Sequence, residues 1–224
     1  MLTTTAALAF AAGATGLSAF NFAYYRAHGS KCFRAQGAPW GEPPFATLGH
    51  AAQREWALAQ TRQHYVLTSE TNGGQKGLPE MTPQLPQLLP LGSRRVQGSG
   101  VAVRFRLVRP SGGWSGGARL RFACDEHGSL ASAAGLSATL NGVALNRTTN
   151  ASAPFPSALP AFWPPSAYAA FDIPLAALGA HHEGAPALTA LATLTPAGER
   201  AAPGFVPPAA SVRVIYADLA VGMS

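Results

Sequence analysis

Hydrophobic and polar residues alternate along two stretches in the middle of the chain. Over residues 101–107 the odd positions are apolar and the even positions are Ala or Arg. Over residues 119–124 Leu, Phe and Cys alternate with Arg and Ala. This period of two predicts half-buried β-strands, because successive side chains of a strand point to opposite faces of the sheet. The side chains expected to point inward are Val101, Val103, Phe105, Leu107, Leu120, Phe122, Leu140 and Ile173.

The rest of the C-terminal part carries the same kind of signal. Asn141-Gly142 lies between two alternating runs and predicts a tight hairpin. Pro- and Gly-rich loops are expected between the strands, and many short strands with almost no helix predict an antiparallel β-sandwich from about residue 65 to 224. Further strands are predicted at 168–173, 188–194 and 212–221, and loops at 76–100, 146–166 and 195–211.

The first 64 residues have a different pattern. An Ala-rich helix over residues 6–12 is followed by Gly13, a residue that commonly ends a helix. A short turn then leads into an apolar segment, Leu17–Phe22, which is predicted to be a buried strand. A helix followed by a buried strand is typical of α/β proteins with a parallel sheet. Residues 45–63 predict an amphipathic helix whose apolar side carries Leu48, Ala52, Trp56 and Ala59.

The N-terminal 20 residues have a second interpretation as a secretory leader. They are apolar, but the first basic residue is Arg26, so the positively charged start of a leader is missing. The same segment is too short and too weakly apolar for a membrane span. Asn146 and Asn150 each begin an Asn-x-Ser/Thr glycosylation sequon, which agrees with secretion. Secretion therefore remains open, and the sequence assigns no compartment.

Composition and charge exclude some classes of protein. Charged residues are only 12% of the chain, which excludes disorder driven by charge repulsion. Frequent Pro and Gly exclude a long coiled coil. The net charge is +6, and half of the arginines lie between Arg94 and Arg121. If the strands at 101–107 and 119–124 pair, Arg104, Arg106, Arg119 and Arg121 form a basic stripe for an anionic polysaccharide or nucleic acid. A solvated face is the simpler interpretation, because no aromatic residues are interleaved with these arginines.

No motif for a common enzyme chemistry is present. The chain lacks a Gly-x-Ser-x-Gly elbow, a phosphate-binding loop, a dinucleotide-binding fingerprint and a CxxC pair. Two cysteines, Cys32 and Cys124, are too few for a zinc site or a disulfide framework. The clusters at 125–127 and 181–183 combine His with acidic residues, and polar loops explain them best. We therefore predict no catalytic residue, metal ligand or cofactor, and the oligomeric state is left open.

Several segments, in order along the chain, resemble the end of a TIM-barrel glycoside-hydrolase-like protein. GATGLSAFNFAYYRAHG resembles the last helix–strand step of such a barrel, and WGEPPFATLGH followed by REWALAQTRQHYVL resembles the passage into a C-terminal sandwich. ATLNGVAL, AYAAFDIPLAALG and VRVIYADLAV resemble strands of jelly-roll accessory domains. Two departures stand out: Thr15 replaces the usual acidic residue, and HHEGAP replaces the usual Gly-x-Asn.

The resemblance implies a mainly β fold, with a jelly-roll-like sandwich at 65–224 preceded by a short α/β remnant of a barrel at 1–64. The catalytic carboxylates of such barrels lie on strands upstream of this segment, so it implies a non-catalytic accessory or carbohydrate-binding part. Asn21, Tyr24, Tyr25 and Arg26 are the candidate sugar contacts, although a cap by Asn21 and packing of the tyrosines against the sandwich are the simpler interpretation. Two alternatives are a stand-alone carbohydrate-binding or interaction sandwich and, less favoured, a basic β-domain that binds nucleic acid. We expect no membrane association.

Overall fold

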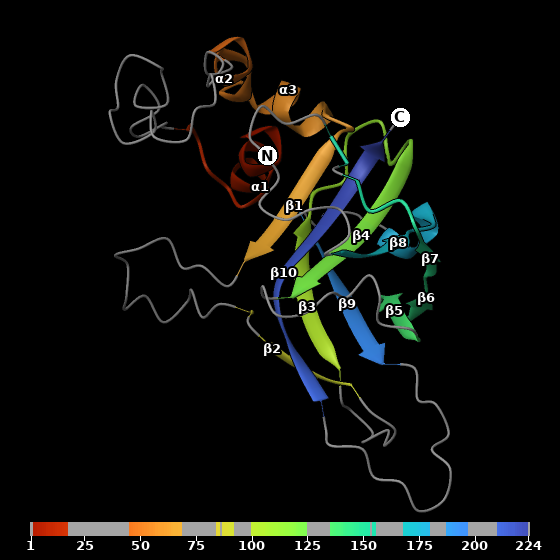
Figure 1. The fold of residues 1–224 in the computed structure, drawn as a ribbon. Helices are drawn as coiled ribbons and strands as arrows, with labels where there is room; N and C mark the ends of the chain where they lie inside the picture. The colour runs from red at the N-terminus through yellow and green to blue at the C-terminus, as the bar shows by residue number, and fades with distance from the viewer. Residues whose placement is uncertain are drawn as a thin grey trace, which may run out of the picture.

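The structure is a computed structural model in which two antiparallel β-sheets pack against each other (Figure 1). Short helices from the N-terminal part lie together beside one edge of the sheets. The mainly β fold predicted from the alternating pattern is therefore confirmed. The structure describes residues 2–17, 45–68, 84–85, 87–91, 100–124, 135–152, 154–155, 168–179, 187–196 and 210–223.

Within these residues the larger sheet has six strands, organised around the long C-terminal strand β10. β10 pairs with β4 along one side. Along its other side, residues 216–221 of β10 pair with β1 and residues 210–214 pair with β2. β4 continues the sheet through β8 to β7. The strands are β1 (Gln63–Thr68), β2 (Gln87–Leu91), β4 (Gly117–Cys124), β7 (Asn146–Thr148), β8 (Tyr168–Asp172) and β10 (Ala210–Met223).

The smaller sheet has four strands in the described residues, in the order β3 (Val101–Leu107), β9 (Leu188–Pro196), β5 (Leu136–Leu140) and β6 (Val143–Ala144). The β5–β6 connection is the predicted hairpin. Asn141 and Gly142 have φ angles of 51° and 80°, as a two-residue turn of this kind requires. The Asn-Gly prediction is thus confirmed, because few other residue pairs adopt these angles without strain.

The inner faces of the two sheets form the main hydrophobic core. All eight side chains predicted to point inward are buried, from 0% exposed for Leu120 to 5% for Ile173. Along β3, buried and exposed residues alternate without a break. Burial of each large apolar side chain contributes about 1.5–3 kcal/mol, so the period-two pattern alone accounts for much of the driving force for this sandwich.

The helical part differs from the prediction in one respect. α1 (Leu2–Ala11) ends just before Gly13, which has a φ of 95°, as expected for a helix-terminating glycine. The single helix predicted over 45–63 is wrong: the chain forms α2 (Phe45–Ala51) and α3 (Arg54–Ala59), separated by an extended Gln53. No helix in the described part of the chain is long and apolar enough to cross a membrane.

Packing against α1 explains the break between α2 and α3. Ala51 and Ala57 are buried in one cluster with Ala6 and Phe10 of α1. A continuous helix with the predicted apolar side would bury Ala52 instead, but Ala52 is exposed. The extended backbone at Gln53 allows both short helices to contact α1, and this contact decides which residues are buried.

Two strands lie in segments predicted to be loops. β2 falls within residues 76–100 and β7 within 146–166, and both form by pairing with an existing strand of the larger sheet. β2 is also held by Leu89, which is fully buried in the core. The strand predicted at 17–22 lies outside the described residues except for Leu17, which is not in a strand.

Candidate functional site: a buried arginine–aspartate network

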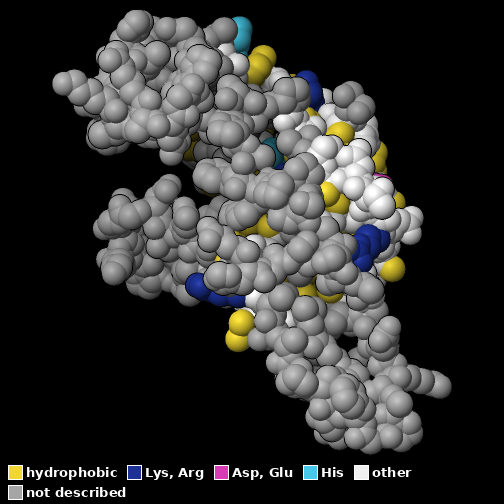
Figure 2. All heavy atoms as spheres, viewed as in Figure 1, with side chains coloured by type: hydrophobic (Ala, Val, Ile, Leu, Met, Phe, Trp, Pro, Cys, Tyr) yellow, Lys and Arg dark blue, Asp and Glu magenta, His cyan; other side chains and the backbone are white. Residues whose placement is uncertain are grey.

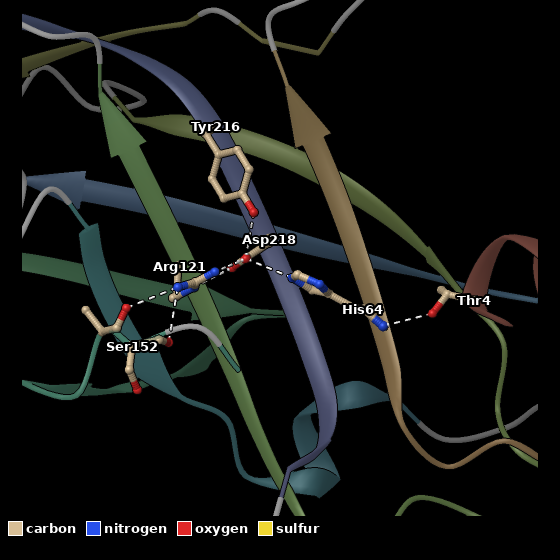
Figure 3. A network of polar contacts seen from close by, with 7 residues as sticks. Thr4, His64, Arg121, Ser152, Tyr216 and Asp218 are labelled. Carbon is tan, nitrogen blue, oxygen red and sulfur yellow. Dashed lines mark hydrogen bonds and ion pairs between the residues drawn. The ribbon is translucent and has the colours of Figure 1, made fainter. Parts of the chain in front are cut away.

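The main cluster of ionisable side chains in the described residues lies on the outer face of the six-stranded sheet (Figure 3). Arg121 of β4 is directly opposite Asp218 of β10 in the strand register. Tyr216 lies two residues before Asp218 and therefore shares its face. His64 of β1 is opposite Ala220, which makes it a diagonal neighbour of Asp218. Three adjacent strands thus bring one acid, one arginine, one histidine and one tyrosine together.

Asp218 is at the centre of this network. Arg121 binds its carboxylate through two nitrogens: Nε donates to Oδ1 at 3.0 Å and Nη2 donates to Oδ2. The Tyr216 hydroxyl donates to Oδ2 at 2.8 Å, and His64 Nε2 lies 2.9 Å from the same oxygen. The Asp218 side chain is inaccessible to solvent. Such a carboxylate is stabilised only because donors surround it on every side.

The arginine is equally well satisfied. Arg121 is 5% exposed, and its Nη1 donates to the carbonyl oxygens of Ala151 and Ser152 at 3.0 and 3.1 Å. Its guanidinium carbon lies 4.4 Å from the centre of the Tyr168 ring, a cation–π geometry. The segment at 151–152 therefore lies against the outer face of the sheet and helps to bury this ion pair.

Electrostatics keep the pair charged. Burial raises the pKa of Asp218, but the hydrogen bonds from His64 and Arg121 and the positive charge of Arg121 outweigh it, so this pKa lies below its usual value. Burial, followed by the charge of Asp218, raises the pKa of Tyr216. Near neutral pH the carboxylate is therefore ionised and the phenol protonated. Asp218 has its acceptor sites occupied and is a poor general base.

The network also connects the helices to the sheet. The backbone N–H of His64 donates to Thr4 Oγ1 of α1 at 2.9 Å, while the imidazole contacts Asp218 (Figure 3). The ring of Phe155 lies edge-on to His64 at 5.9 Å between centroids. His64 is thus a junction between α1, β1 and the ion pair.

The predicted basic stripe does not form as one feature. Arg104 and Arg106 lie on β3 of the four-stranded sheet, whereas Arg119 and Arg121 lie on β4 of the six-stranded sheet, so the assumed pairing of these strands is wrong. Arg104 and Arg106 are exposed. On the face seen in Figure 2, the Lys and Arg side chains of the described residues lie at separate places.

The other two arginines are paired with carboxylates. Arg121 is buried against Asp218, so the expectation that it faces solvent is also wrong. Arg119 donates from Nε to Asp172 Oδ1 at 3.2 Å, an ion pair in which the Asp172 side chain is 53% exposed. Two of the four positive charges are therefore compensated within the protein.

The remaining predicted residues divide into two groups. Asn146 and Asn150 of the glycosylation sequons are exposed, on β7 and just after it. The candidate sugar contacts Asn21, Tyr24, Tyr25 and Arg26, and the acidic clusters at 125–127 and 181–183, lie outside the described residues. Among the residues that are described, no group of His, Cys, Asp or Glu is arranged to hold a metal ion.

Asp218 was not predicted as a site residue, although one feature of the sequence pointed to it. Asp218 is the only charged residue between Val214 and Val221, a segment predicted to be a strand. A lone acid in such a strand needs a cationic partner, because an unpaired buried charge costs several kcal/mol. Identification of that partner as Arg121 requires the pairing of β10 with β4.

The chain matches no protein-family model, and comparison with curated proteins gives no match.

Proposed function

We propose that this chain is a non-catalytic β-sandwich module of a carbohydrate-active protein. In this proposal it corresponds to the C-terminal part of a TIM-barrel glycoside-hydrolase-like protein. The sandwich from residue 65 onward is jelly-roll-like and acts as an accessory or carbohydrate-binding unit. Residues 1–64 derive from the last helix and strand of the barrel, and Asn21, Tyr24, Tyr25 and Arg26 are its candidate sugar contacts.

The state of the described carboxylates is the observation that carries this proposal. Asp218 and Asp172 are both bound to arginines, and Glu55 is exposed on α3. β10 and β8 lie on either side of β4, and Asp218 is opposite Arg121 whereas Asp172 is opposite Arg119, so the backbones of the two acids are about 12 Å apart across the sheet. A glycosidase needs two carboxyl groups that are free to act as acid and as base or nucleophile, about 5–5.5 Å apart in retaining enzymes and about 6.5–9.5 Å apart in inverting ones. Asp218 and Asp172 do not form such a pair, because each carboxylate is bound by an arginine of β4.

The contact between helices and sandwich gives further support. α1 packs on α2 and α3, and Thr4 and Ala7 of α1 contact the sandwich at His64 and Val108. An accessory sandwich fixed to a preceding α/β unit requires a contact of this kind. A stand-alone binding sandwich does not require it, so we place that alternative second.

Carbohydrate binding is tested with the purified chain on a glycan array and in pull-down assays with insoluble polysaccharides. We expect retention on at least one polysaccharide that persists at high salt, because stacking and hydroxyl hydrogen bonds depend little on ionic strength. Binding of nucleic acid that falls steeply with salt would favour the basic-domain alternative instead. The transcript sequence upstream of Met1 would separate a barrel-linked module from a stand-alone one.

Hydrolysis is the second measurement. We expect no release of reducing sugar by the isolated chain above an enzyme-free control, because a catalytic carboxylate pair is not expected in it. The matched control is the same assay with an active glycosidase of known specificity. Turnover by the chain that disappears on substitution of one of its ten acidic residues would contradict the proposal.

A further inference from the structure

β3 is an edge strand whose open side is covered by side chains. Within the described residues β3 pairs only with β9, and no other described strand pairs with its open side. Gln84 and Gln87, here called the glutamine pair, lie against this open side. Gln84 Nε2 donates to the carbonyl oxygen of Arg104 at 2.8 Å, and its Oε1 accepts from the N–H of Arg104.

Gln87 repeats this arrangement two residues earlier on β3. Its Nε2 donates to the carbonyl oxygen of Ala102 at 2.7 Å, and its Oε1 accepts from the N–H of Ala102 at 3.0 Å. Gln87 Nε2 also donates to the backbone carbonyl oxygen of Gln84 at 2.8 Å, which fixes the Gln87 amide relative to the backbone at Gln84. A primary amide carries the same donor and acceptor as a peptide group. The glutamine pair therefore takes the place of an adjacent strand.

The segment that carries the glutamine pair is firmly anchored. Leu85 and Leu89 are buried in the core, at 1% and 0% exposed. The backbone of β2 pairs with β10 of the larger sheet, while the side chain of Gln87 binds the smaller sheet. β2 thus belongs to the larger sheet through its backbone and contacts the smaller sheet through the side chain of Gln87 (Figure 1). This anchoring holds both amides in position against β3.

An uncovered β3 has the properties of a strand that self-associates. It is regular over seven residues, contains no proline, and carries four core side chains on one face. Antiparallel pairing with a second copy, centred on Val103, would place Arg104 opposite Ala102 and Arg106 opposite Gly100. In this register no arginine lies opposite another arginine. The paired residues Ala102 and Arg104 both direct their N–H and C=O groups to the open side, so they can form backbone hydrogen bonds with the second copy. Exposed strands of this kind are templates for edge-to-edge pairing.

We propose that the glutamine pair blocks strand addition at β3, and that the uncovered edge pairs with the same edge of a second copy of this chain. The test is sedimentation velocity of the full chain over a range of micromolar concentrations. The wild-type chain is expected to be monomeric, and the double variant Gln84→Ala/Gln87→Ala to form dimers as its concentration rises. In the double variant at low concentration, amide exchange at Ala102 and Arg104 should be about tenfold faster or more.

A third substitution checks that the association uses this edge. Ala102→Pro removes an N–H group that faces the open side of β3. In the described contacts this N–H donates only to Gln87. An edge strand tolerates proline at such a position, because no hydrogen bond to the neighbouring strand is lost. Added to the double variant, it should restore the monomer. A folded double variant that stays monomeric would overturn the proposal, and so would association that persists with Ala102→Pro. If circular dichroism shows that the double variant is unfolded, Gln84→Ala is tested alone. Amide exchange at Arg104 should then be faster than in the wild type. Unchanged exchange at Arg104 would overturn the proposal.

Discussion

The variant Asp218→Asn is expected to lose about 3–5 kcal/mol of unfolding free energy, one of the largest effects of a single substitution in this chain. The replacement keeps the size of the side chain but removes its charge. Arg121, which is 5% exposed, would then carry a buried positive charge without a counter-ion. Urea denaturation followed by tryptophan fluorescence and circular dichroism measures this loss.

Asp172→Asn is the matched control. It makes the same chemical change in an Asp–Arg pair between β4 and β8, on the other side of β4, but the Asp172 side chain is 53% exposed. Water screens this pair, so the expected loss is about 0–1 kcal/mol. A second comparison separates pairing from burial: Arg121→Met combined with Asp218→Leu should be more stable than Asp218→Asn alone, because it leaves no buried charge. Equal losses in Asp218→Asn and Asp172→Asn would contradict the role assigned to burial.

Acid titration should give a related result. Because the pKa of Asp218 is lower in the folded chain than in the unfolded chain, the unfolded state takes up the proton first as the pH falls. The stability that this carboxylate contributes is complete above its unfolded pKa, about 3.9, and is lost as the pH falls through the lower folded pKa. The difference in unfolding free energy between the wild type and Asp218→Asn should therefore shrink below about pH 4. A difference that stays constant down to pH 2 would argue against ionisation of Asp218 as its source.

The second large effect is expected at Gly222, near the end of β10. Gly222 has a φ of 79°, and a Cβ atom there would overlap the carbonyl oxygen of Thr61 and lie 2.8 Å from its carbonyl carbon. Both neighbours are backbone atoms of the segment that enters β1, so a side chain cannot rotate away from them. Gly222→Ala should cost about 3 kcal/mol, of which ~1 comes from the left-handed backbone and the rest from the steric clash. Thermal and urea unfolding measure this cost.

Gly142→Ala isolates the conformational part of this cost. Gly142 has nearly the same φ, 80°, in the β5–β6 hairpin, but no atom lies within 4 Å of the position of its Cβ. This variant should lose only about 1 kcal/mol, because it has the left-handed strain without the clash. If the two variants lose the same amount, the close approach of Thr61 to Gly222 has no energetic consequence and the prediction fails.

The strands and their buried faces could be predicted from the sequence because both depend on local periodicity. The alternation along residues 101–107 identifies β3 and its core side chains, and Asn141-Gly142 identifies the β5–β6 hairpin from two residues alone. The end of α1 near Gly13 is predictable for the same reason, since a glycine with positive φ ends a helix locally. None of these features depends on a distant part of the chain.

Features that depend on strand pairing could not be predicted in this way. The alternating arginines of β3 and β4 have the same local pattern, but the strands belong to different sheets, so Arg104 faces solvent while Arg121 meets Asp218. The break between α2 and α3 likewise follows from packing on α1 rather than from their own residues.

The alternation of apolar and polar residues identifies 101–107 and 119–124 as strands with one apolar face, because side-chain direction repeats every two residues. The environment of the polar face depends on contacts between segments far apart in the chain. Long-range pairing brought Asp218 and His64 beside Arg121, and residues 151–152 covered it. The same holds for β3, whose open side is closed by two glutamine side chains from a segment predicted to be a loop. A buried charge or an open strand edge is stabilised by whichever groups lie next to it in space, and local periodicity does not contain that information.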